Sequence, residues 1–350
     1  MERTPTYHTQ DWSQKVMSEL VYNQLRSCES RLLHYPCASI FDETTQFCDL
    51  LTLWEMSYDY MEEDLIDMPT RSELCEMAYY QLHDEILYVS VGEERLLKRL
   101  LKEQGETYIK NEDELIYAES LMKRYWCTLE FSQDNGTAKL TLHDSLVLPI
   151  STRMKSKEAK KIRLLYHTFD AIIKGFLYIT GFLYIESVLN HFLTTTLKQT
   201  DKPTVRYVMR SICASYDYCY DKHGNMMLLH PAMPNPEALF QDVTFKSAIV
   251  EVDISQHMLW AGSESILPEE KNVCEMMTNV LMDRLQPEVD IQEAVDDLKF
   301  MVKSGASYQE LLEVTGNMLC VLPDSSITSV LKRMELEVVR WIGVPSRMVN

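Results

Sequence analysis

Apolar positions along the chain recur mostly three and four residues apart, the spacing that places them on one face of a helix. Segments of this kind predict helices at 11–33, 44–61, 71–89, 93–104, 111–125, 157–174, 185–197, 202–214, 271–285, 291–304, 308–320 and 326–342. Capping signals support three of them, because Thr70 stands three residues before Glu73, Asp201 stands before Pro203, and Gly105 follows the 93–104 segment. The chain is therefore expected to be mostly α.

The apolar period switches to two at two places. From Cys127 to Phe131 apolar and polar residues alternate, a turn follows at 134–136, and apolar positions then return as far as Pro149. From 216 to 220 tyrosines alternate in the same way, ahead of a turn at 221–225 and a return at 226–229. Alternation followed by a tight turn predicts a β-hairpin in each place.

Helices followed by a hairpin thus occur twice, at 71–149 and 157–231, with a bend expected at 175–181. Three helices before a hairpin is the order of elements in a winged helix. The expected fold is mostly α with small β-hairpins, as tandem winged-helix-like units plus a C-terminal helical domain. The expected domains are 1–66, an N-terminal helical region; 67–150, helices plus a hairpin; 151–232, a basic winged-helix-like unit; and 233–350, the C-terminal helical domain. Pro231, Pro234 and Pro236 mark the last boundary.

Charge singles out the second of these units. The formal net charge is -19, so the chain as a whole should repel nucleic acid and anionic membranes at long range. Residues 151–231 nevertheless carry 12 basic and 6 acidic residues, whereas 37–119 carry 21 acidic and 6 basic ones. A basic island therefore coincides with the 157–231 unit.

The helix at 202–214 is the best candidate binding element in that island. Its apolar stripe is expected to be buried and consists of Val205, Val208, Met209 and Ile212. In a winged helix this element enters the major groove, where arginines contact phosphates or guanine edges. The expected binding residues are Lys202, Arg206, Tyr207 and Arg210, with further phosphate contacts from Lys160, Lys161 and Arg163. The alternative is that these cations pair with the chain's own acids or face a protein, and the acidity of the chain favours it.

No catalytic or metal-binding pattern accompanies this surface. The chain lacks G-x-S-x-G, G-x-x-x-x-G-K-[ST] and H-E-x-x-H motifs. Its nine cysteines have scattered spacing, and a group at Cys213, Cys219, His223 and His230 lacks the closely paired ligands of a zinc site. Reduced thiols and a polar start at residues 1–10 favour a cytoplasmic protein, and no membrane segment, metal or cofactor is expected. Methionines 276, 277 and 282 are expected to fill the core, or else to line an adaptable protein-binding groove.

Three segments resemble a little-characterised group of bacterial proteins. These are the glycine-flanked run 175–181, the 185–197 helix and the 218–230 hairpin. Members share a winged-helix-like core, many begin with a Rho N-terminal or SAP-like helical lead-in, and some end in a SEC-C zinc-binding tail. Met68–Leu82 is similar to that lead-in and Val295–Trp341 to the closing helices, but no cysteine-rich tail follows here. The resemblance implies a fold and no particular chemistry.

The function expected from the sequence is that of a non-enzymatic regulatory or interaction protein, with a protein partner favoured. Duplex nucleic-acid binding through the 202–214 helix is the first alternative. A hydrolytic enzyme acting in a cleft between acidic domains is the alternative from another class. That reading would require a deep pocket with two or more strongly perturbed carboxylates.

Overall fold

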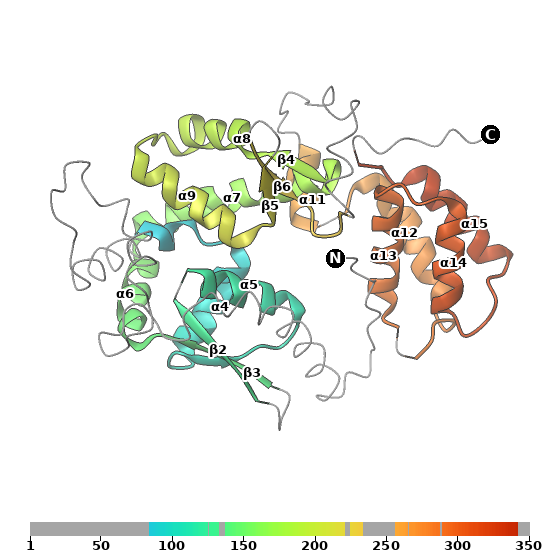
Figure 1. Cartoon of the computed structure of the whole chain (residues 1–350), viewed down its shortest axis with the longest axis horizontal. Helices are drawn as coiled ribbons and strands as arrows, with labels where there is room; N and C mark the ends of the chain where they lie inside the picture. Colours follow the sequence, from blue (N-terminus) through green and yellow to red (C-terminus); the bar gives the residue numbers. More distant parts are fainter. Residues whose placement is uncertain are drawn as a thin grey trace. The chain divides into compact units, whose positions relative to one another are not determined.

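The computed structural model describes residues 84–341, except for gaps at 125, 133–136, 221–224, 234–255, 265 and 288. In this part of the chain helices dominate, and two three-stranded antiparallel sheets accompany them (Figure 1). A mostly α fold with small β elements is thereby confirmed. None of the helices described is both long and apolar enough to cross a membrane. The predicted helices at 11–33 and 44–61 lie outside the described residues.

The described residues divide into two compact units. Unit 1 contains Phe169–Asn190 and the described part of Asp217–Asn350, whereas unit 2 contains the described part of Ser13–Thr168 together with His191–Tyr216. Each unit is therefore assembled from segments that are far apart in the sequence.

Unit 2 combines helices with one small sheet. Its elements are η2 Ile86–Tyr88, α4 Val91–Lys102, β1 Glu106–Tyr108, α5 Glu112–Lys123, β2 Cys127–Ser132, β3 Thr137–Leu142, α6 Asp144–Lys155, the first half of α7 Lys157–Thr180, the π-helical turn η3 Phe192–Leu197, and α9 Lys202–Ser215. Local caps explain several starts: Ser90 and Glu93 form a reciprocal capping box on α4, and the side chain of Asp201 accepts from the Thr204 amide at the start of α9. The Asp201 cap is confirmed.

Unit 1 contains the second sheet and a C-terminal group of helices. Its elements are the second half of α7, β4 Phe182–Tyr184, α8 Ile185–His191, β5 Tyr218–Tyr220, β6 Met226–Leu229, α11 Gln256–Glu264, α12 Pro268–Leu281, α13 Ile291–Lys303, α14 Tyr308–Met318 and α15 Ser325–Glu337. The last four helices are those that the periodicity predicts from residue 271 onward.

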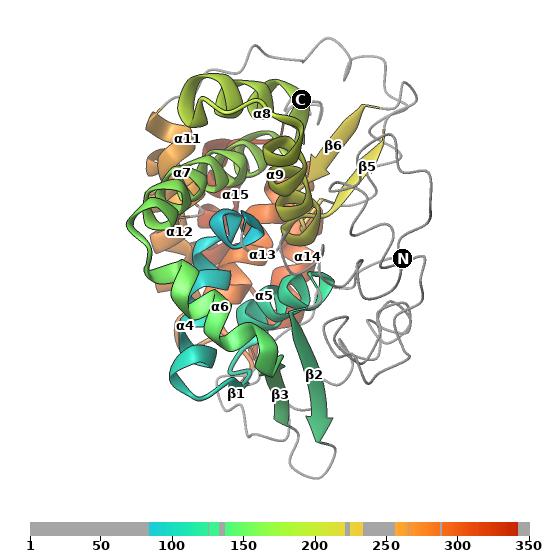
Figure 2. The same ribbon diagram turned by 90° about the vertical axis from the view of Figure 1, so that its left-hand side faces the viewer.

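The two sheets share one topology. Their strand orders are β1-β3-β2 and β4-β6-β5, so in each the strand that comes last in the sequence lies in the centre. The hairpins that the alternation predicts are confirmed as β2–β3, which Figure 2 shows side by side, and β5–β6. The pattern does not predict β1 and β4, because a strand of three residues is too short to reveal alternation.

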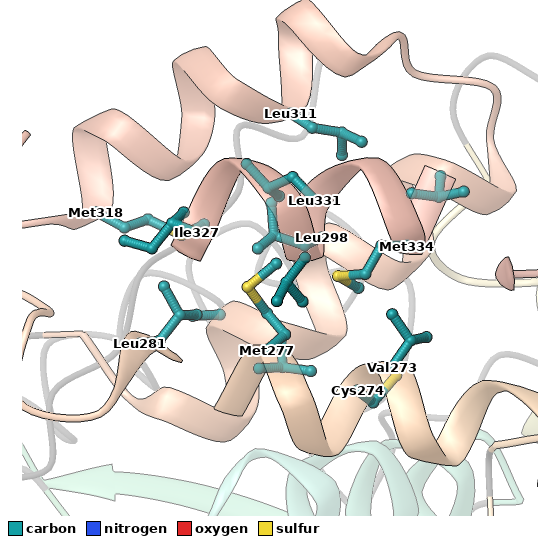
Figure 3. Close-up of a cluster of buried hydrophobic side chains, with 14 of the residues drawn as sticks. Val273, Cys274, Met277, Leu281, Leu298, Leu311, Met318, Ile327, Leu331 and Met334 are labelled. Atoms are coloured by element: carbon teal, nitrogen blue, oxygen red, sulfur yellow. The ribbon is translucent and has the colours of Figure 1, made fainter. Parts of the chain in front are cut away.

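Helices α12 to α15 pack into a bundle around one apolar core (Figure 1). Figure 3 shows Met277 of α12 pointing toward Leu298 of α13 and Leu331 of α15, and all three side chains are fully buried. The buried residues of each of these helices recur three and four positions apart, which is the amphipathic spacing that the sequence shows. Burial of this stripe is what stabilises the bundle, since each large apolar side chain removed from water contributes roughly 1.5–3 kcal/mol.

Two expectations about local structure are wrong. The apolar run before Pro149 is part of helix α6, in which Leu146, Ile150 and Met154 are buried at intervals of four while Leu148 is exposed. The bend expected at 175–181 is instead the continuous end of α7, which runs to Thr180 before Gly181 takes a left-handed φ of 80°. Pro149 lies inside α6 and Gly175 inside α7, although both residue types disfavour helices. Tertiary packing outweighs their unfavourable helix propensity in both places.

A close helix crossing requires a glycine at position 262. A Cβ atom on Gly262 of α11 would lie 1.8 Å from the carbonyl oxygen of Ala171 and 2.9 Å from the amide nitrogen of Gly175, both on α7. The backbones of α7 and α11 therefore touch at a point that only glycine allows.

Two helical glycines should consequently respond in opposite directions to alanine. Gly262→Ala is expected to lower the free energy of unfolding by more than about 2 kcal/mol, because backbone atoms must move. Gly316→Ala in α14 meets nothing closer than Pro323 at 3.9 Å, so it should raise stability by roughly 0.5–1 kcal/mol through helix propensity. Urea denaturation of both variants checks this, and a loss at Gly316 or a gain at Gly262 would contradict it.

Candidate functional site

Helix α9, the predicted binding element, turns a different face inward from the one its apolar stripe indicates. Its buried positions are Thr204, Tyr207, Val208, Ser211, Ile212 and Ala214, whereas Val205 and Met209 are half-buried. Val208 and Ile212 are buried as expected, but Tyr207 belongs to the interior and not to the flank of an exposed surface. The inward face includes polar groups because unit 2 provides partners for them.

The arginines of α9 are both half-buried. Arg210 Nε lies 2.8 Å from a carboxylate oxygen of Glu85, whose side chain is buried. Arg206 lies one turn earlier on the same helix, and Lys202 stands in its first turn. The structure therefore places Arg210 in an internal ion pair of unit 2.

The basic start of α7 divides into buried and exposed positions. Arg163 is only 3% exposed; its Nε lies 3.2 Å from Glu94 and its Nη2 donates to the carbonyl of Met154 at 2.7 Å. Lys160 and Lys161, two and three residues earlier, are exposed. Of the three predicted phosphate-contacting residues on α7, Arg163 is thus committed to the interior.

A larger polar cluster, which the sequence does not predict, joins α4, α5 and α9 inside unit 2. The carboxylate of Glu93 accepts from the amide of Ser90 at 2.6 Å, from Ser120 Oγ at 2.6 Å and from Arg124 Nε at 3.1 Å. Arg124 Nη1 in turn donates to Ser211 Oγ at 3.0 Å. The only sequence signal for this cluster is Ser90 three residues before Glu93, the spacing of a capping box.

Unit 1 has a second internal cluster, centred on Glu270 at the start of α12. Both Glu270 and Lys303 of α13 are fully buried, and their charged groups lie 2.7 Å apart. The same carboxylate accepts from the amides of Leu267 and Val339 and from the hydroxyl of Tyr178. Burial raises the pKa of Tyr178, and the Glu270 carboxylate raises it further. Burial also lowers the pKa of Lys303, although Glu270 opposes the change.

An aromatic wall adjoins this cluster. The Lys303 ammonium lies 4.0 Å from the centre of the Tyr178 ring, and the Trp341 indole donates to the carbonyl of Tyr178 at 3.0 Å. The His230 ring lies 4.8 Å from Phe300 and 5.2 Å from Trp341, centre to centre. The segment after α15 is thereby fixed to the end of α7 and to α13.

Neither cluster presents a reacting group to a dissolved substrate, because Glu93, Glu270 and Lys303 are each fully buried. Within the ranges that the structure covers, no three His, Cys, Asp or Glu side chains gather as metal ligands would. The geometry therefore assigns both clusters a role in holding segments of each unit together.

His230 should make stability depend on pH. Burial, together with Lys303 and Lys299, lowers the pKa of His230 from 6.5 to about 4. Between pH 4 and pH 6.5 the unfolded state therefore binds more protons at this histidine than the folded state does. The stabilisation from neutral His230 is complete above pH 6.5 and is lost as pH falls toward 4. The loss should be on the order of 2 kcal/mol, allowing for partial exposure of the ring. Asp297 acts in the opposite direction, since burial and Asp296 raise its pKa to about 6.

The measurement is urea unfolding between pH 4 and 8 for the wild type and His230→Phe. The variant keeps Asp297, so the difference between the two curves isolates the histidine. Above pH 6.5 the free energies of unfolding of the two proteins should differ by a constant amount. Below pH 6.5 the wild type should lose stability relative to His230→Phe. Parallel curves across the whole range would contradict a buried neutral His230.

Several large apolar side chains of unit 1 are exposed on its surface, and three of them lie in the loops at one end of the helical bundle. At the end of the bundle where α12 and α14 terminate, Met282, Val321 and Leu322 are 52%, 55% and 91% exposed. Their loops are joined, because the amide of Cys320 donates to the carbonyl of Arg284 at 2.9 Å and that of Gln286 to the carbonyl of Met318 at 2.9 Å. We call these three side chains the bundle-end patch.

The expectation that methionines 276, 277 and 282 fill the core holds for two of the three. Met277 is fully buried in the bundle core and Met276 is half-buried, so the two act as core residues. Met282 alone of the three is exposed, and its apolar neighbours come from the loop after α14. No sequence pattern links residue 282 to residues 321–322, whose two loops are joined by the backbone bonds between Cys320 and Arg284 and between Gln286 and Met318.

Comparisons of the chain with protein-family models, with curated proteins and with solved structures find no match.

Proposed function

We propose that this chain is a non-enzymatic regulatory or interaction protein that uses winged-helix-like modules to bind another protein. The order of elements from α7 to β6 is helix, strand, helix, helix, strand, strand, and the last strand is central in its sheet. Those features are common to winged helices. The shared strand order of the two sheets supports a tandem duplication, and the resemblance to bacterial proteins with such a core supports the same module.

Two of the predicted phosphate-binding arginines form ion pairs within the chain, and this observation favours a protein partner over a nucleic acid. Arg163 pairs with Glu94 and Arg210 pairs with Glu85. Moving either guanidinium to a phosphate would leave a carboxylate without its cation, and for the buried Glu85 this costs several kcal/mol. The net charge of -19 adds long-range repulsion of any polyanion.

The test compares two binding experiments on the full chain. In the first, a fluorescent DNA duplex is titrated at low ionic strength, and no saturable binding is expected. In the second, the tagged chain is cross-linked in extracts of its native cell, and recovery of a single partner in stoichiometric amount is expected.

A duplex affinity that falls steeply with salt and that weakens in a Lys160→Ala, Lys161→Ala double variant would overturn the proposal. These two lysines are the right probes because both are exposed, so their removal should not disturb the fold. Absence of any stoichiometric protein partner would count against it independently.

A further inference from the structure

We infer that the acidic segment 42–67 of this chain docks on an exposed lysine surface of unit 2, where helices α6 and α7 meet. This surface, the lysine face, consists of Lys155, Lys157, Lys160 and Lys161. Its occupant is part of the same chain, so the assignment does not depend on the partner proposed above. Three observations carry it: the lysines have no carboxylate beside them, the segment has acids and no bases, and the described chain begins next to α6.

The charges of the lysine face are not neutralised by the residues around it. All four lysine side chains are exposed. The neighbouring acids have arginine partners: Asp84 and Glu158 lie 3.6 and 3.8 Å from the guanidinium of Arg153, and Glu94 lies 3.2 Å from Arg163. None of the acids that the structure describes forms an ion pair with the lysine face. Four lysines and Arg153 against Asp84 and Glu158 leave three positive charges in excess.

The lysine face also includes apolar surface. Leu164 is 58% exposed and stands four residues after Lys160, on the same side of α7. Leu148 is 75% exposed and stands seven residues before Lys155, on the same side of α6. The dipoles of α6 and α7 offset each other where the helices meet at Ser156, so the positive charge comes from the side chains. A fitting occupant therefore has both acidic and apolar residues.

Segment 42–67 has both properties. It contains nine acidic residues and no lysine, arginine or histidine. The helix predicted at 44–61 has apolar residues three and four positions apart, at Leu50, Leu51, Trp54 and Tyr58. An acidic amphipathic segment complements a lysine face that contains exposed leucines, in both charge and polarity.

The place where the described chain begins brings this segment to the lysine face. Asp84 is the first described residue, and its Oδ1 lies 3.6 Å from Nη2 of Arg153, two residues before Lys155 on α6. Residues 68–83 connect the acidic segment to Asp84 and reach at most roughly 55 Å. A short tether of this kind gives an effective concentration on the order of millimolar. Weak exposed ion pairs are then sufficient for docking.

Other occupants lack the tether. A second copy of the chain and a separate polyanion are both repelled at long range by the net charge of -19. Segment 42–67 is instead held near unit 2 by the chain itself. While docked, it shields the lysine face from nucleic acid.

The experiment is zero-length carbodiimide cross-linking of the full chain, which joins a lysine amine to a carboxylate in contact with it. A mixture of isotope-labelled and unlabelled chains separates cross-links within one chain from those between two. Mass spectrometry should find the lysine face joined to acids of segment 42–67 in the same chain. Added salt should lower this yield, because exposed pairs are screened. The control lysine is Lys102, exposed in the last turn of α4, where the yield should be about threefold lower or less.

Charge reversal tests the surface directly. Lys160→Glu with Lys161→Glu should lower the yield at the two remaining lysines of the face by about threefold or more, since half of its cations become anions. Both positions are exposed, so the fold should be retained, and urea unfolding checks this. The matched control reverses Lys102 and Lys110, two exposed lysines of the same unit, and should leave the yield within about twofold of the wild type.

A charge swap separates docking from a change in net charge. Adding Glu62→Lys and Glu63→Lys to the Lys160→Glu, Lys161→Glu variant should restore most of the yield, because opposite charges face each other again. A loss that the swap does not restore would overturn the inference, as would equal yields at Lys102 and the lysine face. Cross-links chiefly between two chains would assign the surface to a second copy, and loss of the cross-links on addition of a DNA duplex would assign it to nucleic acid. Either result also overturns docking of the chain's own segment.

Discussion

Replacing Glu270 by leucine is expected to lower the free energy of unfolding of unit 1 by about 3–5 kcal/mol. The change leaves the Lys303 ammonium fully buried without its carboxylate. It also removes the acceptor of two backbone amides, at Leu267 and Val339, and of the Tyr178 hydroxyl. Each buried donor that loses its acceptor adds a desolvation penalty.

Urea denaturation of the full chain, followed by circular dichroism, measures this loss. Amide hydrogen exchange should in addition show faster exchange at Val339 and Trp341, since the carboxylate holds the segment after α15. The matched control is Glu337→Leu. Glu337 pairs with Arg333 four residues earlier on the surface of α15, and such pairs contribute only about 0.3–0.5 kcal/mol.

A second variant separates the charge from the packing. Glu270→Leu combined with Lys303→Leu removes both buried charges, and the double variant should be more stable than Glu270→Leu alone. A double variant that is less stable than the single one would mean that Lys303 contributes through its other contacts, with Val339 and the Tyr178 ring. A loss below about 1 kcal/mol for Glu270→Leu would contradict the buried ion pair itself.

Replacing Glu93 by leucine should lower the stability of unit 2 by a similar amount, about 3–5 kcal/mol. Glu93 is fully buried and has two functions. Its carboxylate completes the capping box of α4 by accepting from the Ser90 amide, and it binds Ser120 and Arg124 of the α5 region. Loss of the cap alone costs about 1 kcal/mol, and the unpaired Arg124 accounts for most of the rest.

The control for this variant is Glu119→Leu on α5, where Glu119 forms a half-buried pair with Lys123 four residues later on the same helix. Its effect should stay below about 0.5 kcal/mol. Glu93→Gln keeps the side-chain shape and one acceptor oxygen, so it should fall between the wild type and Glu93→Leu. Equal losses in the free energy of unfolding for Glu93→Leu and Glu119→Leu would show that the cluster around Glu93 contributes little to the stability of unit 2.

Most helices of the described chain could be predicted from the sequence because their stability depends on local rules. The stripe in α13 and the Asp201 cap of α9 are examples, since an amphipathic period and a capping side chain act within a few residues. The strands β1 and β4 could not be predicted, because a three-residue strand is stabilised only by its partner in the sheet. Helix α6 differs from the expectation for a related reason: Pro149 suggests an end, but burial of Leu146 and Ile150 stabilises a helix there.

The candidate binding residues were harder to place than the elements that contain them. Helical spacing puts Arg206 and Arg210 on one side of α9 but cannot reveal that Glu85 lies beside Arg210. The same applies to Arg163 and Glu94, which are 69 residues apart in the sequence. Whether a cation is available to a ligand depends on carboxylates that only the folded chain brings near it.

The sequence by itself therefore determined the helical class, the two hairpins, the caps and the uneven distribution of charge, because these follow from period, propensity and composition over short windows. Only the tertiary structure decided which charged residues are internal and which apolar residues remain exposed. Glu270 pairs with Lys303, and the loop after α12 is bonded to the loop after α14 between Arg284 and Cys320, through contacts between distant segments. Such contacts depend on the packing of whole helices, which no local pattern encodes.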